Sequence, residues 1–419
     1  MLPLLACSML QAALPTPTAA VLRTPSLTST PRLIRRTPGR ALTRVALRTL
    51  MGPTRTPGPT STPVPTRLTS TPTSTFSLVD SLPRLHSIDI PAPSLANNLL
   101  AEPDQRHLLV YLPHSYFQEF AKRYPVVYYL LDFGTSAIPG GMPLEGLDSD
   151  VESGFAKEMI VVIIDGVNAL GGSFYVNSPV TGNWDDFVTR DVVSYIDAQY
   201  RTLPDSASRG ISGYNMGGFG ALNLAMLHPD VFGVVYSLDP AIFDDTGLGE
   251  SPVFAPEGII DDFIDLEARE RLMTVDEALA DMKRTTGDLQ FTLAYGAAFA
   301  PDPQAGPPYI DYPYTRQSGR LFRDEATWER WDVALGDLPN KVIAYEANLL
   351  KLRALVIDVG DDSRHHWSQR GAQYFSEKLT AAEIPHQLIH FVGDHEADLE
   401  RDLRLFVLPF FSEELVFDE

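Results

Sequence analysis

The segment from Arg209 to Ala221 constrains the fold of this chain more than any other. It reads Arg-Gly-Ile-Ser-Gly-Tyr-Asn-Met-Gly-Gly-Phe-Gly-Ala, between a short β-forming stretch and a stretch rich in Ala, Leu and Met. A strand that turns sharply into a helix needs glycines around its apex, because side chains there would clash. We therefore expect Asn215 to stand at the apex and point up from the sheet, with the next backbone N–H facing the same place.

The rest of the body alternates between apolar, β-forming runs and stretches with helical spacing. The predicted strands are 86–91, 107–113, 124–132, 159–165, 208–212, 231–238, 352–359 and 386–392. The predicted helices are 185–200, 217–228, 367–382 and a C-terminal helix from about residue 395. Continuous apolar runs such as 124–132 are typical of strands buried on both faces. The alternation predicts an α/β fold with a mostly parallel central sheet and helices on both faces.

Residues 240–350 interrupt this alternation. They contain a charged helical stretch near 261–284 and five aromatic residues, Tyr309, Tyr312, Tyr314, Trp328 and Trp331. We interpret this segment as a long insertion before the penultimate strand, covering one end of the sheet as a lid. The folded domain as a whole is expected to span residues 79–419.

Charge and composition set the N-terminal quarter apart. Residues 1–75 contain nine arginines and no Asp, Glu or Lys, whereas the formal net charge of the chain is −21. The acidic remainder would repel phosphate backbones, so nucleic acid is excluded as a main partner. Of residues 53–75, 18 are Pro, Ser or Thr, and we expect residues 9–78 to form a disordered Thr/Pro/Ser-rich tether because such a segment buries too little apolar surface to fold.

The first eight residues contain Leu4-Leu5-Ala6-Cys7, which resembles the lipobox of bacterial lipoproteins. Only six residues precede Cys7, so either residues 1–8 are a truncated signal or the match is chance. The first alternative predicts an extracytoplasmic domain held at the cell surface by a lipid on Cys7. The sequence contains no run of 18 or more apolar residues, so it predicts no transmembrane helix.

A strand, a glycine-flanked turn and a helix make up the nucleophile elbow, usually G-x-S-x-G. The segment resembles that of the putative-esterase family, which includes esterase D and the mycolyltransferase antigens and whose elbow reads G-x-S-M-G-G. Further resemblances lie at 172–179, 182–187, 228–232 and 393–395, so the similarity spans roughly residues 86–413. It implies an α/β-hydrolase fold and a carboxylic-ester hydrolase or acyltransferase acting on a small-molecule ester or a glycan ester, with no cofactor.

The resemblance also assigns roles to residues. Asn215 takes the nucleophile position, His395 that of the general base, and Asp362 or Asp361 that of the acid. The oxyanion hole is assigned to Met216, Phe133 and Gly134, and substrate contact to Tyr214, Trp184 and Tyr175. The adjacent pair His365 and His366 does not predict a metal site, because neighbouring residues rarely face one ion together.

Asn215 conflicts with the family's chemistry, because a carboxamide has no ionisable proton near neutral pH and is a poor nucleophile. Ser212 lies three residues earlier, on the strand, and is no substitute. Three hypotheses follow: an esterase scaffold that binds without turnover, an active esterase with a rearranged site, and a surface-tethered module that binds a carbohydrate or partner through its aromatic insertion. The sequence leaves the oligomeric state open.

Overall fold

A computed structural model describes residues 84–138, 146–251, 254–361, 366–395 and 399–418, together with the backbone of residues 34–36. Residues 1–8, nearly all of the expected tether, and Asp362 and His365 therefore lie outside the described residues. The strand β1 (Ile34–Arg36) falls within the expected tether and pairs in parallel with β13.

The centre of the fold is a sheet whose strands run in the order β1-β13-β12-β9-β8-β4-β5-β3-β2. Its remaining strands are β2 (Leu85–Pro91), β3 (Gln105–Tyr111), β4 (Val126–Leu130), β5 (Ile160–Ile164), β8 (Arg209–Tyr214), β9 (Val234–Leu238), β12 (Ala354–Gly360) and β13 (Gln387–Phe391). Only the pairs β2–β3 and β3–β5 are antiparallel among the described strands of this sheet. All eight predicted strands are confirmed, and so is the mostly parallel α/β fold.

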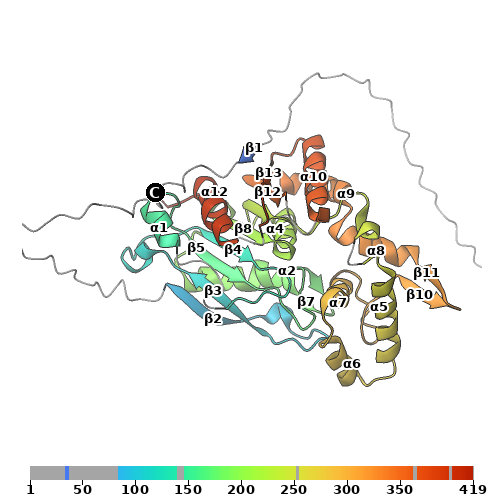
Figure 1. Ribbon diagram of the computed structural model, residues 1–419. Helices are drawn as coiled ribbons and strands as arrows, with labels where there is room; N and C mark the ends of the chain where they lie inside the picture. Colours follow the sequence, from blue (N-terminus) through green and yellow to red (C-terminus); the bar gives the residue numbers. More distant parts are fainter. Residues whose placement is uncertain are drawn as a thin grey trace, which may run out of the picture. The chain divides into compact units, whose positions relative to one another are not determined.

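Both faces of the sheet are covered, as Figure 1 shows. The helix α4 (Met216–Leu227) packs on β8 and β9, on the same face as α2 (Trp184–Asp186), α3 (Val193–Gln199) and α10 (His366–Ala381). The opposite face is covered by α1 (Leu147–Glu152), by the π-helical segment η8 (Leu403–Val407), which follows α11 (Leu399–Asp402), and by α12 (Leu408–Glu414). On β4, Tyr128 packs into the first core and Tyr129 into the second, which explains why this strand reads as one apolar run.

The insertion lies between β9 and β12, as predicted. It contains α5 (Glu257–Glu270), α6 (Val275–Met282), α7 (Gly287–Phe299), the hairpin β10 (Tyr314–Gln317) and β11 (Arg320–Arg323), α8 (Glu325–Leu335) and α9 (Leu338–Leu349). Figure 1 shows most of these elements, in yellow to orange, gathered beside the sheet. None of the helices in the described ranges has the length and apolar character of a membrane span.

Candidate functional site at the turn between β8 and α4

Asn215 stands at the apex of the turn between β8 and α4. Its backbone has φ 49° and ψ −105°, a strained conformation for a residue with a side chain. Hydrogen bonds hold the apex on both sides: its N–H donates to Leu238 O at 3.0 Å, and its carbonyl accepts from Ala241 N at 3.1 Å. A Cβ on Gly217 would lie 2.0 Å from Leu130 O, so this position accepts only glycine. The local backbone is therefore that of a nucleophile elbow.

The backbone N–H groups beside the apex converge on a carboxylate of the chain itself. Met216 N donates to Asp132 Oδ1 at 3.1 Å, and Phe133 N donates to the same oxygen at 2.6 Å. Asn215 Nδ2 donates to Asp132 Oδ2 at 3.4 Å. The N–H of Gly134, which was also predicted for the oxyanion hole, donates instead to Gly171 O at 2.8 Å. The structure thus brings Asn215, Met216 and Phe133 together around Asp132.

His395 is fully buried between two carboxylates. Its Nδ1 lies 2.5 Å from Asp402 Oδ2, and its Nε2 lies 3.2 Å from Asp358 Oδ1. Burial alone would lower the pKa of this imidazole, but the hydrogen bonds to Asp358 and Asp402 outweigh it and raise the pKa to about 10. Tyr236 donates its hydroxyl to Asp358, and Arg401 pairs with Asp402. A protonated imidazole engaged at both nitrogens has no lone pair with which to take a proton from residue 215.

The described carboxylates around His395 are Asp358 and Asp402, whereas Asp362, the first choice for the acid, lies outside the described residues. Asp361 is exposed and lies 3.5 Å from His390 Nδ1, not beside His395. Asp239, which follows β9, is buried and accepts a hydrogen bond from Gly360 N at 3.0 Å. Burial raises its pKa to about 7, although the positive charge of His395 works in the opposite direction.

Comparisons with known proteins agree with this geometry. A family model described as "Putative esterase" matches residues 101–411. The chain belongs to the putative-esterase family. Two curated relatives, Esterase MT1326 and Esterase Rv1288 of Mycobacterium tuberculosis, are each 31% identical over 121 residues, which is 28% of this chain and only 25% of each relative. A solved structure described as a ferulic acid esterase superposes with a TM-score of 0.50 at 20% identity, covering 79% of this chain and 98% of that one, and shows the shared fold.

In this esterase-family chain, two of the three residues predicted to touch substrate are wholly enclosed. Trp184 is buried, donates its Nε1–H to Thr181 O at 2.9 Å and lies under the guanidinium of Arg106, 4.5 Å from the ring centroid. Tyr175 is also buried and donates its hydroxyl to Leu131 O at 2.7 Å. Tyr214 is 5% exposed and packs in the core on the opposite face of the sheet. Substrate contact by these side chains stays a prediction, since their described contacts are all within the protein core.

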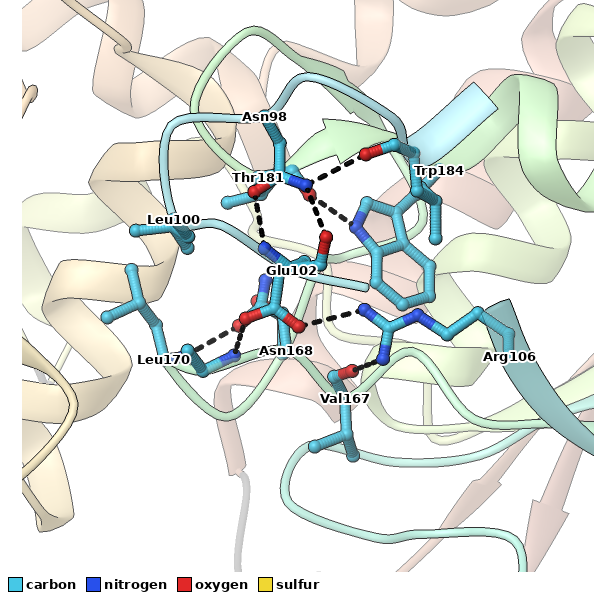
Figure 2. A network of polar contacts seen from close by, with 12 residues as sticks. Asn98, Leu100, Glu102, Arg106, Val167, Asn168, Leu170, Thr181 and Trp184 are labelled. Carbon is cyan, nitrogen blue, oxygen red and sulfur yellow. Dashed lines mark hydrogen bonds and ion pairs between the residues drawn. The ribbon is translucent and has the colours of Figure 1, made fainter. Parts of the chain in front are cut away.

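Figure 2 shows the network of hydrogen bonds and ion pairs around Trp184. Glu102 pairs with Arg106 at 2.9 Å and accepts from Ala169 N at 2.7 Å. Asn168 donates to Gly172 O at 2.9 Å, which fixes the loop whose Gly171 carbonyl receives the Gly134 N–H. The network therefore holds the backbone behind the cluster at Asp132. No short sequence motif distinguishes these residues, because they come from the loop before β3, from β3 itself, from the loop after β5 and from α2.

The insertion contacts the loop after β4, beside the esterase family's elbow. Phe291 of α7 contacts Phe133, with ring centroids 4.9 Å apart, and Tyr295 lies 5.4 Å from Trp331. Trp331 is 1% exposed and donates its Nε1–H to Asp311 O. These aromatic side chains form the insertion's own core, which disfavours an open sugar-binding platform. Tyr314 and Trp328 pack against each other at its surface, with partial exposure.

A Ser-His-Asp arrangement lies at the edge of the sheet, away from the turn at Asn215. Ser87 Oγ is 3.0 Å from His107 Nε2, and His107 Nδ1 is 3.0 Å from Asp89 Oδ1. Ser87 and Asp89 are exposed on an open sheet face, where water competes for each partner. Such a setting lacks the enclosed, preorganised polarity from which catalytic triads derive most of their rate enhancement. Ser87 is therefore a control residue for esterase assays. Among the described residues, no cluster of three or more potential metal ligands is present.

Proposed function

We propose that this chain is an esterase-family domain that binds a carboxylic ester or a glycan ester without turning it over at the elbow. The observation that carries the proposal is Asn215 at the strained apex between β8 and α4, the position of the family's serine. The acyl-enzyme mechanism needs an oxygen that a base can deprotonate, and a carboxamide supplies none. Loss of the nucleophile in such enzymes costs on the order of a millionfold in rate.

Two further features of the site support an inactive elbow. The Met216 and Phe133 N–H groups, which would stabilise a tetrahedral intermediate, already donate to the Asp132 carboxylate. The His395 imidazole, proposed as the base by its place in the family pattern, is held by Asp358 and Asp402. A nucleophile, an empty oxyanion hole and a free base are all needed together.

The setting of the domain is part of the same proposal. We infer that Cys7 carries a lipid anchor and that the Thr/Pro/Ser-rich segment holds the domain away from the cell surface. Mass spectrometry of the protein from membranes of the producing cell tests this: a lipid-modified N-terminal peptide beginning at Cys7 is expected, and an unmodified peptide extending through Cys7 contradicts it.

Ester hydrolysis tests the inactive elbow directly. The substrates are p-nitrophenyl acetate and methyl ferulate, the latter because of the fold shared with a ferulic acid esterase. We expect the native chain and Asn215→Ala to hydrolyse both at the same background rate. Asn215→Ser is expected to stay within about tenfold of that rate, because the base and the oxyanion hole remain engaged.

Three other results would each have a distinct meaning, and the first would contradict the proposal. Native activity that disappears in Asn215→Ala would show that the native elbow is active. Native activity that disappears only in Ser87→Ala would come from the sheet edge and not from the elbow. Strong activity in Asn215→Ser alone would agree with Asn215 as the cause of inactivity. It would contradict the reading that the contacts of His395 and Asp132 block the base and the oxyanion hole.

A further inference from the structure

Asp132 lies where three hydrogen-bond donors meet. Oδ1 receives the N–H groups of Met216 and Phe133, at 3.1 and 2.6 Å, and Oδ2 faces the Asn215 carboxamide at 3.4 Å. Met216 is the first residue of α4, a helix of 12 residues, so its N–H lies at the positive end of the helix dipole. Backbone N–H groups at a helix start are a ready anion site, and here the anion is a side chain of the same chain.

We propose that Asp132 is a built-in occupant of the oxyanion hole, which excludes acyl oxygens and carboxylate ligands from it. This rests on the proposed function, because it takes the turn at Asn215 to be the family's elbow. An ester carbonyl can reach Met216 N and Phe133 N only by displacing a charged acceptor with a neutral one. Hydrogen bonds to charged groups exceed neutral ones by an amount that corresponds to roughly a 5- to 30-fold preference. The native hole therefore disfavours an acyl oxygen even where the rest of a ligand fits.

The backbone around Asp132 is held in place independently of its side chain. Gly134 N is bound by Gly171 O, and Phe133 packs against Phe291 of the insertion. Met216 N is held by the helix that it begins. Removing the Asp132 carboxylate should therefore leave two or three convergent donors with space for one small anion of the same shape. Formate is that anion, since it is a carboxylate group without a side chain.

The experiment is thermal unfolding of Asp132→Ala in increasing sodium formate, compared with sodium chloride at equal ionic strength. We expect 100 mM formate to raise the unfolding midpoint of this variant by about 2–4 °C more than chloride does. The native chain should show no such difference, because its hole is filled. Asp132→Ser, whose shorter side chain also vacates the hole, is the second variant and should behave like Asp132→Ala.

Asp165→Ala is the matched control. Asp165 follows the neighbouring strand β5, and its carboxylate accepts from Ala137 N at 3.0 Å, a donor that does not belong to the elbow. We expect formate to stabilise this variant no more than chloride does. The inference is overturned if formate stabilises neither Asp132 variant, or if it stabilises Asp165→Ala equally. Neither result involves hydrolysis, so failure here is distinct from failure of the proposed inactive elbow.

Discussion

Replacing His395 with glutamine separates a structural histidine from a catalytic one. In the structure the imidazole bridges two buried carboxylates, Asp358 and Asp402. Glutamine is similar in length but cannot carry the positive charge. Removing one partner from a buried ion pair typically costs about 3–5 kcal/mol of unfolding free energy. Arg401 still pairs with Asp402, so we expect a value near the lower limit, about 3 kcal/mol.

The same contacts predict a pH dependence. The pKa of His395 is raised from 6.5 to about 10 in the folded state, so the folded chain keeps a proton that the unfolded chain loses. The stabilisation is complete below pH 6.5 and is lost as the pH rises through about 10. Between pH 6.5 and pH 8.5 the difference in unfolding free energy between the native chain and His395→Gln should shrink by roughly 2–3 kcal/mol. Groups such as Glu270, whose pKa burial raises to about 8, titrate in both chains and cancel in this difference.

Urea denaturation at pH 6.5, 7.5 and 8.5 measures both effects. His366→Gln is the matched control, because His366 is exposed at the start of α10 and should change the unfolding free energy by less than about 0.5 kcal/mol. A His395→Gln variant that is destabilised by less than about 1 kcal/mol at every pH, with a difference from the native chain that does not change with pH, would refute the buried bridge. The imidazole would then be available to residue 215, as the family pattern implies.

Two further substitutions test the surroundings of the elbow. Gly217→Ala places a Cβ 2.0 Å from the backbone oxygen of Leu130, so we expect the unfolding midpoint to fall by at least about 5 °C. Gly258→Ala, in α5, has open space around the new Cβ and should leave the midpoint unchanged or higher. Equal midpoints for the two variants would contradict the packing of the turn. Asp239→Asn removes a buried carboxyl group whose pKa is raised from 3.8 to about 7. The variant should therefore have a higher unfolding free energy than the native chain, by a difference that grows between pH 4 and pH 8 and exceeds about 1 kcal/mol at pH 8. A difference independent of pH would contradict the burial of that charge.

The sequence predicted the strands and the elbow because both leave local signals. A strand buried on two faces reads as a run of apolar residues, and the turn at Asn215 needs Gly217 because a Cβ there would meet backbone. The insertion was visible as a break in the alternation of strands and helices. These features depend on residues that are adjacent in the chain.

The interactions inside the site could not be predicted in the same way. Asp358 lies within β12 and Asp402 lies in α11, and only the fold brings them to His395. Asp132 ends a predicted strand, which was the available signal, but the contact of its carboxylate with Met216 N depends on two residues that lie 84 positions apart in the chain. The family pattern supplied positions for a nucleophile, a base and an acid, and the side-chain contacts at those positions required the structure.

Covalent labelling measures directly whether the elbow carries an acyl-forming nucleophile. The native chain is incubated with a fluorophosphonate, which phosphonylates activated serines, and its intact mass and elbow peptide are then determined. We predict no adduct on the native chain under conditions that label an active serine esterase completely, and none on the peptide that contains Ser212 and Asn215. A stoichiometric adduct on that peptide of the native chain would contradict the proposed inactive elbow.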